Sequence, residues 1–206
     1  MTDVKVKICG VTTEADARAC AEAGADFIGL IFAASDRRVA RDRAVAIRQA
    51  VPDAKLVGVF AGHDAVQIAE ISRLAGLDLL QLHGGEPLPL RTTVKERTGL
   101  PVARVVHAET ILEPGSPFAD DSLLYDLPKG RPHTDNDLQA LWQAARLGAE
   151  AHQQVFLAGG LNPDNVAAAI AAVRPFAVDV SRGVESAPGV KDLELVRRFL
   201  AEVRGA

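Results

Sequence analysis

The sequence predicts a single (β/α)8 TIM barrel, an α/β fold, over residues 1–206. Short apolar runs alternate with helical patterns along the whole chain, which indicates parallel strands covered on both faces. No linker or shift in composition divides the chain. Eight such runs begin near residues 4, 27, 55, 79, 101, 122, 154 and 176. A doubly wound open sheet is the alternative, and the number of units favours the closed barrel.

The first predicted strand, at residues 4–10, carries polar side chains on one face. Lys5, Lys7 and Cys9 alternate with apolar residues, and Gly10 ends the run. The active sites of barrels lie at the C-terminal ends of strands, where Cys9 stands. A free cysteine is also often a small buried hydrophobe. Its place at a strand end, with Lys7 on the same face, makes a reactive thiol as plausible as a buried one, so both interpretations stay open from the strand alone.

Helix signals separate the predicted strands. Thr12 or Thr13 can cap the first helix. Thr13 and Asp16 have the spacing of a capping box, and Gly24 is suited to end that helix. Asn162, followed by Pro163 and an acidic residue, is typical of a helix start. The other helices are expected at 41–50, 64–74, 87–97, 137–149 and 192–203, with a short or missing helix at 107–119 and loops at 33–38, 127–136 and 181–191.

The composition argues against several classes of protein. A net charge of −4 with mixed signs is unlike a nucleic-acid surface. No window approaches the roughly 18 apolar residues of a membrane span, and the chain reads directly into a strand without a signal peptide. Cys9 and Cys20 lack the spacing of a zinc site or a disulfide framework, and Cys20 is expected in the core. We therefore expect a cytoplasmic protein that binds no metal, nucleic acid or membrane, and we separately expect a monomer.

The predicted strand ends bring together several groups that can carry chemistry. Strands seven and eight end in Gly159-Gly160 and Ser181-Arg182-Gly183, and many barrels bind phosphate at these two turns. Gly159-Gly160 alone is most simply a tight turn, but the second glycine turn favours a phosphate site. Asp126 ends strand six and needs a partner if it is buried. His83 ends strand four and is either a satisfied turn histidine or a catalyst.

Six motifs, in order and covering nearly the whole chain, resemble the phosphoribosylanthranilate isomerase family of tryptophan biosynthesis. No single motif decides the resemblance, but six in register are specific. They are Lys7–Gly10 (KICG), Gly29–Phe32 (GLIF), Val57–Phe60 (VGVF), Leu80–Gly84 (LQLHG), Leu157–Val166 (LAGGLNPDNV), and Val178–Glu185 (VDVSRGVE) through Pro188–Asp192 (PGVKD).

The resemblance implies an Amadori rearrangement that needs no cofactor. N-(5-phosphoribosyl)anthranilate becomes 1-(2-carboxyphenylamino)-1-deoxyribulose 5-phosphate. Cys9 stands at the position of the family's general base and Asp126 at that of its general acid. The acid protonates the furanose ring oxygen, and the base takes the proton from C2. We hypothesise that Lys7 assists the thiolate electrostatically, with Asp179 as the partner of Lys7.

The resemblance also assigns the two ends of a phosphorylated substrate. Arg37 matches the arginine that meets the anthranilate carboxylate. The family's Ser-Pro-Arg is replaced by Ser35–Arg38 (SDRR), so Arg38 is an alternative for this role. The phosphate loops match Gly159, Gly160, Ser181 and Gly183.

Two further departures from the family pattern concern the phosphate end. Residues 129–135 lack the family's Gly-Gly-Thr-Gly run, and Arg182 replaces its second serine. Arg182, with Lys129 or Arg131, is expected to replace the lost amide contacts by charge, or else substrate binding is weaker or altered. Two other functions remain alternatives: another sugar-phosphate isomerase of this barrel type, such as one acting on an aminoimidazole ribonucleotide, and a barrel that binds phosphorylated ligands without turnover.

Overall fold

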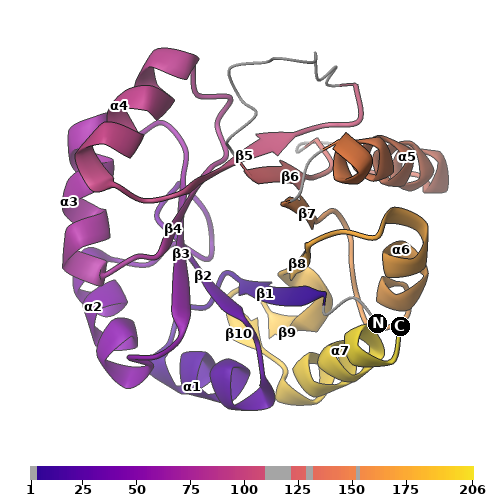
Figure 1. Cartoon of the computed structure of the whole chain (residues 1–206). Coiled ribbons are helices and arrows are strands. Elements are labelled where there is room, and N and C mark those ends of the chain that lie inside the picture. The colour runs from indigo at the N-terminus through magenta and orange to yellow at the C-terminus, as the bar shows by residue number, and fades with distance from the viewer. Residues whose placement is uncertain (1–3, 110–121, 129–131, 152–153) are drawn as a thin grey trace.

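The computed structural model of the chain describes residues 4–109, 122–128, 132–151 and 154–206. Its centre is a closed barrel in which each strand pairs in parallel with its chain neighbour and β8 pairs with β1 (Figure 1). The predicted closed barrel is confirmed, and each strand begins within one residue of its expected start. The strands are β1 Lys5–Cys9, β2 Phe27–Ile31, β3 Lys55–Phe60, β4 Leu79–Leu82, β5 Val102–Val106, β6 Ser122–Tyr125, β7 Val155–Leu157 and β8 Ala177–Val180.

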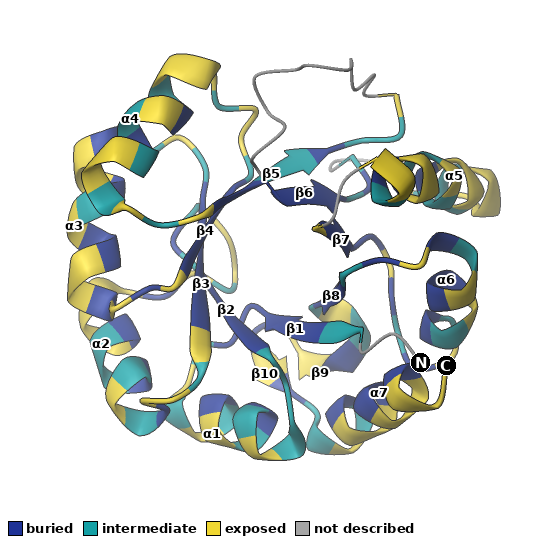
Figure 2. Cartoon of the chain, viewed as in Figure 1, coloured by how far each residue is buried: buried dark blue, intermediate teal, exposed yellow. Residues whose placement is uncertain are grey.

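Helices surround the barrel and turn their buried faces toward it (Figure 2). They are α1 Glu14–Ala23, α2 Arg41–Ala50, α3 Ala65–Ala75, α4 Leu88–Thr98, α5 Asp135–Ala151, α6 Val166–Val173 and α7 Leu193–Gly205. In the part of the chain that is described, no helix is both long and apolar enough to cross a membrane. The expected short or missing helix at 107–119 falls mostly outside the described residues.

The helix starts follow side-chain capping, with two differences from expectation. The Thr13 side chain accepts a hydrogen bond from the Asp16 amide, as its sequence position predicts. The prediction that Asn162 caps α6 is wrong, because the Asn162 amide donates to the Asn165 side chain in a separate turn and α6 begins at Val166. Helix α5 begins two residues before the expected Asp137.

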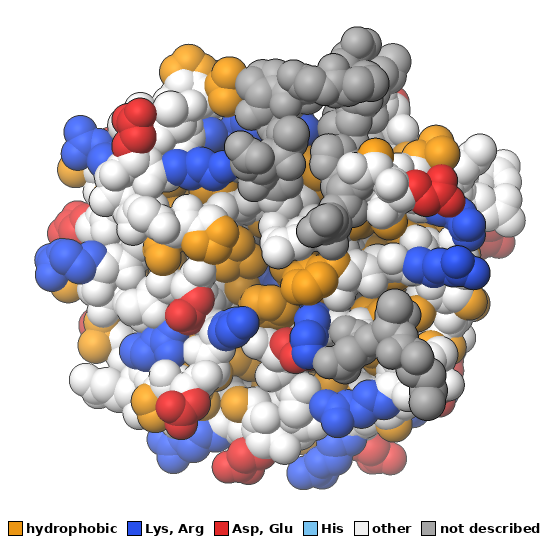
Figure 3. Space-filling view, in the orientation of Figure 1, with side chains coloured by type: hydrophobic (Ala, Val, Ile, Leu, Met, Phe, Trp, Pro, Cys, Tyr) orange, Lys and Arg blue, Asp and Glu red, His pale blue; other side chains and the backbone are white. Residues whose placement is uncertain are grey.

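Two apolar layers hold the barrel together. The larger layer lies between strands and helices and contains Cys20, which is fully buried with its pKa raised by burial to about 12. The smaller layer fills the barrel interior, and hydrophobic side chains gather at the centre of the ring in the space-filling view (Figure 3). Its members are Phe27, Val57, Leu79, Ala103, Leu124, Phe156, Ala158 and Ala177.

The segment expected as a loop at 181–191 contains further regular structure. A short 3-10 helix, η1 (Arg182–Val184), leads into an antiparallel hairpin of β9 (Glu185–Ala187) and β10 (Val190–Lys191). Pro188-Gly189 makes its turn, with Gly189 at φ +77° as a type II turn requires. The hairpin lies next to the end of β1, because the Thr12 hydroxyl donates to the Gly189 oxygen at 2.6 Å.

Candidate active site

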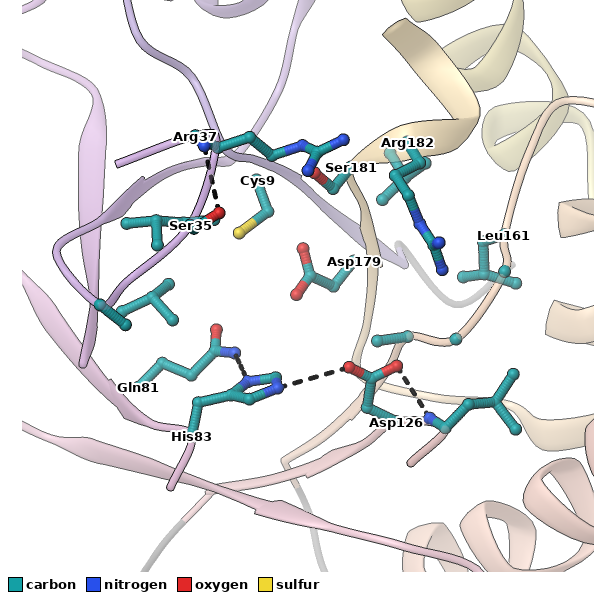
Figure 4. A pocket seen from close by; sticks show the side chains of 18 of the residues that line it. Cys9, Ser35, Arg37, Gln81, His83, Asp126, Leu161, Asp179, Ser181 and Arg182 are labelled. Carbon is teal, nitrogen blue, oxygen red and sulfur yellow. Dashed lines mark hydrogen bonds and ion pairs between the residues drawn. The ribbon is translucent and has the colours of Figure 1, made fainter. Parts of the chain in front are cut away.

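A cavity of about 680 Å3 opens at the C-terminal ends of the barrel strands (Figure 4). The strand ends and the loops after them supply its wall, as the barrel fold predicts. Most of the residues singled out in the sequence meet in this wall. They are Cys9, Arg37, Asp126, Gly159, Gly160, Asp179, Ser181, Arg182 and Gly183.

Lys7 lies beneath the cavity and is not part of its wall, so the structure does not place it for direct contact with a ligand. Its side chain is fully buried, and Nζ donates to Asp179 Oδ2 and to Gln81 Oε1, both at 2.7 Å. Burial is the largest single influence on the pKa of Lys7 and lowers it, but the interactions with Asp179 and Cys9 together outweigh burial, so the net pKa is raised. The hypothesised pairing of Lys7 with Asp179 is confirmed, and Lys7 is a fixed positive charge.

Cys9 reaches the cavity although only 7% of the residue is exposed. Burial is the largest influence on its thiol and raises its pKa, and the Asp179 carboxylate raises it further. The charge of Lys7 acts in the hypothesised direction, toward the thiolate, but does not overcome burial. The resting thiol is therefore protonated at neutral pH.

Gly29 on β2 makes room for this arrangement. A β-carbon at this position would lie 2.8 Å from Cys9 Sγ and 3.1 Å from Lys7 Cε. Cys9 and Gly29 are register partners in the β1–β2 ladder, so the two backbones fix this approach. Only glycine leaves the space that Cys9 and Lys7 occupy.

Asp126 stands across the cavity from Cys9 (Figure 4). It follows β6 directly, and its Oδ1 accepts the Leu127 amide at 2.8 Å. Its Oδ2 lies 3.7 Å from His83 Nε2. The Asp126 side chain is 20% exposed, so a ligand in the cavity can reach it.

Arg37 is held in the wall by a buried carboxylate. Its Nε lies 3.0 Å from both Glu185 oxygens, and its Nη2 donates to Oε2 at 2.7 Å. Glu185 is also paired with Lys191 at 2.7 Å, and these two cations outweigh burial so that the pKa of Glu185 is lowered. Arg37 Nη1 has no partner among the described residues and remains free for an anion. Arg38 is exposed and absent from the wall, which favours Arg37 in the choice between the two.

Lys191 ties the hairpin to the end of the first strand. Its side chain is completely buried, and Nζ donates to the Cys9 oxygen at 2.6 Å and to the Ser181 oxygen at 3.4 Å. Sequence reasoning missed Glu185, Lys191 and Gln81 as parts of the site. A signal existed for the first two, because Pro188-Gly189 predicts a turn that would bring Glu185 and Lys191 into register.

The glycine turns after β7 and β8 form another side of the cavity. Gly159 and Gly160 have φ of +85° and +73°, which favours glycine at both positions. A β-carbon on Gly183 would meet the Leu161 oxygen at 2.0 Å, so the two turns touch through their backbones. Arg182 is exposed, points toward the Leu161 side of the cavity in Figure 4, and has no carboxylate partner in the described chain. Lys129 and Arg131 lie outside the described residues.

Metal ligands are not clustered in the residues that the structure describes. No group of three or more His, Cys, Asp or Glu side chains there is arranged to hold a metal ion. The wall instead combines a thiol, three carboxyl groups, two histidines, two arginines and glycine turns. This set suits acid–base chemistry on an anionic ligand.

Comparisons with known proteins identify the family. The model of the N-(5'-phosphoribosyl)anthranilate (PRA) isomerase family matches residues 6–202. The N-(5'-phosphoribosyl)anthranilate isomerase of Pelobacter propionicus is 40% identical over 199 residues, which cover 96% of this chain and 94% of that protein. The crystal structure of phosphoribosyl anthranilate isomerase from Thermotoga maritima is 33% identical, with a TM-score of 0.85, and the match covers 98% of this chain and 100% of that one.

A second solved structure adds a ligand. It is a phosphoribosyl anthranilate isomerase in complex with reduced 1-(o-carboxyphenylamino)-1-deoxyribulose 5-phosphate. It is 32% identical, with a TM-score of 0.83 over 98% of this chain and 100% of that chain. The family model and these matches each cover nearly the whole chain. The chain belongs to the N-(5'-phosphoribosyl)anthranilate isomerase family, the isomerases of tryptophan biosynthesis.

Proposed function

We propose that this chain isomerises N-(5-phosphoribosyl)anthranilate to 1-(2-carboxyphenylamino)-1-deoxyribulose 5-phosphate, with Asp126 as general acid and Cys9 as general base. The observation that carries the assignment is the position of these two groups on opposite sides of one cavity (Figure 4). Membership of the family supplies the reaction, and the cavity supplies an acid and a base for its two proton transfers.

Asp126 acts first and Cys9 second. The carboxyl group of Asp126 gives its proton to the furanose ring oxygen as the bond from C1 to that oxygen breaks, leaving a protonated Schiff base. Cys9 acts in its thiolate form, after its thiol proton has passed to solvent: the thiolate takes the proton from C2, and the electron pair of that C–H bond forms the C1–C2 double bond of an enolamine. Tautomerisation of the enol gives the ketose. Lys7 supplies the positive charge that favours the thiolate when Cys9 ionises.

Arg37 and Asp179 are suited to orient the substrate. Arg37 has Nη1 free to meet the anthranilate carboxylate while Glu185 holds the rest of the guanidinium. Asp179 Oδ2 is bonded to Lys7, but Oδ1 is buried at the cavity without a hydrogen-bond partner among the described residues. We assign Oδ1 to a sugar hydroxyl, which would donate to it.

The phosphate group fits the glycine turns after β7 and β8. Backbone amides of Gly159, Gly160, Ser181 and Gly183 are the proposed donors, with Arg182 adding charge. The Ser181 hydroxyl is also buried without a partner in the described chain and can donate to phosphate. In this assignment the charge of Arg182 replaces the amide contacts that a glycine run at residues 129–135 would have made with phosphate.

The test is the fall in anthranilate fluorescence when phosphoribosylanthranilate is supplied. Cys9→Ser and Asp126→Asn should each lower kcat by about 100-fold or more, because each removes one proton-transfer group. Equal rates in the wild type and a variant would remove that residue from its role. A wild-type chain that binds the product without turnover would favour a binding barrel, and turnover of an aminoimidazole ribonucleotide alone would favour the other isomerase.

We further infer that the chain acts as a monomer in the cytoplasm. The strand ends of one barrel carry the proposed acid, the proposed base and both glycine turns, which supports a monomer as the active unit. Light scattering on the eluting protein should give one species near 21.8 kDa. A species of twice this mass across the concentration range would contradict the monomer.

A further inference from the structure

A row of polar side chains connects the lysine beneath the cavity to the proposed acid. Lys7 Nζ donates to Gln81 Oε1 at 2.7 Å. Gln81 Nε2 lies 3.0 Å from His83 Nδ1, and His83 Nε2 lies 3.7 Å from Asp126 Oδ2 (Figure 4). Gln81 and His83 are two residues apart at the end of β4, so both point to the same side of the strand. Neither residue has a role in the proton transfers described above.

Lys7 fixes which way the Gln81 amide faces. An ammonium group has only donors, so it must meet the amide oxygen and not the amide nitrogen. Gln81 is 2% exposed, and a reversed amide would press its NH2 group against Nζ with little access to water. The other end of the amide, Nε2, therefore faces His83 as a donor.

The orientation of Gln81 in turn fixes the tautomer of His83. Nδ1 faces a donor and must accept, so it carries no hydrogen. The hydrogen of the neutral imidazole is then on Nε2, the nitrogen that faces Asp126. A doubly protonated ring would set Nδ1–H against the amide hydrogens of Gln81, so this contact favours the neutral ring.

We propose that Gln81 and His83 are positioning residues: Gln81 keeps the hydrogen of His83 on Nε2, so that His83 cannot accept the catalytic proton of Asp126. A ring nitrogen that already carries a hydrogen has no lone pair with which to take the proton of Asp126. The opposite tautomer would present a lone pair there, and transfer would leave an imidazolium beside a carboxylate that could no longer act as an acid. This inference rests on the proposed function, in which Asp126 is the general acid.

Other titratable groups surround the row and are common to all variants below. Asp179 on β8 pairs with Lys7 at the far end. His107, after β5, has Nδ1 2.8 Å from the Asp126 backbone oxygen. His133 lies in the cavity wall. None of these contacts replaces the Gln81 amide at His83 Nδ1.

The first measurement is the tautomer of His83 in the resting wild-type protein, by nitrogen-15 NMR of the imidazole. We expect the hydrogen on Nε2 at neutral pH. Detection of the Nδ1–H tautomer, or of a doubly protonated ring, would overturn the proposal. This result does not depend on turnover, so it separates the proposal from the proposed function, which fails instead if Asp126→Asn retains full activity.

The second measurement uses three variants with their kcat and KM values. Gln81→Glu puts an acceptor at Nδ1 and favours a hydrogen there, so kcat should fall by about 100-fold with a smaller change in KM. His83→Gln removes the ring that could trap the proton and should cost less than about tenfold. The double variant, Gln81→Glu with His83→Gln, should be faster than Gln81→Glu alone, because no imidazole remains to take the proton.

The double variant also controls for the charge and fold of Gln81→Glu. Both proteins carry the same added carboxylate beside Lys7, so damage from that charge or to folding would slow them equally. Equal rates in Gln81→Glu and the double variant would therefore refute the proton-trap explanation. A higher kcat in the double variant than in Gln81→Glu, together with the Nε2–H tautomer in the wild type, supports the proton-trap explanation.

Discussion

Cys9 combines a place in the cavity wall with burial, and this combination sets the pH at which it can act as a base. Its pKa is raised from an ordinary value of 9.0, mainly by burial, while Lys7 opposes the shift. The thiolate fraction therefore increases with pH throughout the neutral and mildly alkaline range. The same burial keeps water away from the base, which strengthens the charge interactions around it.

Replacing Lys7 by methionine should move the pH dependence of the reaction. Without the ammonium, the thiolate of Cys9 loses its main attraction, and the pKa of Cys9 rises further. The rising limb of kcat/KM against pH should shift to higher pH, measured by the fluorescence assay from pH 6 to pH 10. Lys5→Met is the matched control, because Lys5 lies on the same strand but pairs with Asp26 at 3.3 Å. If the rising limb of kcat/KM against pH does not move in Lys7→Met, Lys7 does not influence the pKa of Cys9.

The hairpin β9–β10 connects distant parts of the chain through the side-chain contacts of Glu185 and Lys191. Glu185 on β9 holds Arg37 from the loop after β2, and Lys191 on β10 holds the end of β1. The Glu185 and Lys191 side chains are only 4% and 0% exposed. Buried charges of this kind are stable only while their partners are present, because an unpaired buried charge is strongly unfavourable.

Glu185→Gln should lower the free energy of unfolding by about 3 kcal/mol at pH 7. The pKa of Glu185 is lowered in the folded state, so its stabilisation is complete above the unfolded value of 4.5 and is lost as pH falls through the folded value. The difference between wild type and variant should therefore shrink below pH 4.5, measured by urea unfolding. Glu150→Gln, which removes an exposed partner of Arg146, should cost less than about 1 kcal/mol. If Glu185→Gln also lowered the free energy of unfolding by less than about 1 kcal/mol, the contacts of Glu185 would not stabilise the fold.

The residues that stabilise the barrel and the residues proposed to carry the chemistry lie at different levels along the barrel axis. The interior apolar layer contains one side chain from each strand from β2 to β8, together with Ala158 directly after β7. Lys7, Gln81 and Asp179 lie in the next level toward the cavity, and the strand ends form the wall. This arrangement predicts that interior truncations destabilise the fold without removing a catalytic group.

Phe156→Ala should cost about 3–5 kcal/mol of unfolding free energy. The Phe156 ring is 2% exposed and makes edge contacts with Phe27 at 5.7 Å and Phe176 at 5.6 Å. Where the variant is still folded, its kcat should stay within about threefold of the wild type, because Phe156 lies below the site. Leu147→Ala, at a 62% exposed position, is the control and should change stability by about 0.5 kcal/mol or less. A large fall in kcat for folded Phe156→Ala would contradict the separation of the two levels.

The sequence was sufficient for the features that depend on local pattern. The strands were predicted because each buried run is apolar and bounded by turn residues, and Cys9, Asp126 and the glycine turns were found because they follow strand ends. Asn162 predicts too early a start for α6, because its residue type is typical of a helix cap but its side chain accepts the Asp164 amide within a separate turn. The roles of individual site residues remain predictions.

The missed residues share a physical reason. Glu185 bonds Arg37 across 148 positions, and Lys7 bonds Gln81 across 74. Their contacts depend on which strand ends meet in space and on which side chains are buried there, and neither follows from local spacing. Gln81 in particular lies in an apolar run and looks like an ordinary polar interruption until Lys7 is placed beside it.

The bond from Lys191 to the Cys9 oxygen has a consequence for biosynthesis. The two residues are 182 positions apart in the chain. The barrel closes only when β1 pairs with β8, which is also made late. Ribosomes add roughly 5–20 residues per second, so the two ends emerge about 10–40 seconds apart. Throughout that interval Cys9 lacks the C-terminal part of the barrel that helps to bury it, and the edge of β1 that pairs with β8 is open. The newborn protein is therefore most open to oxidation and to chaperone capture before its last helix is made.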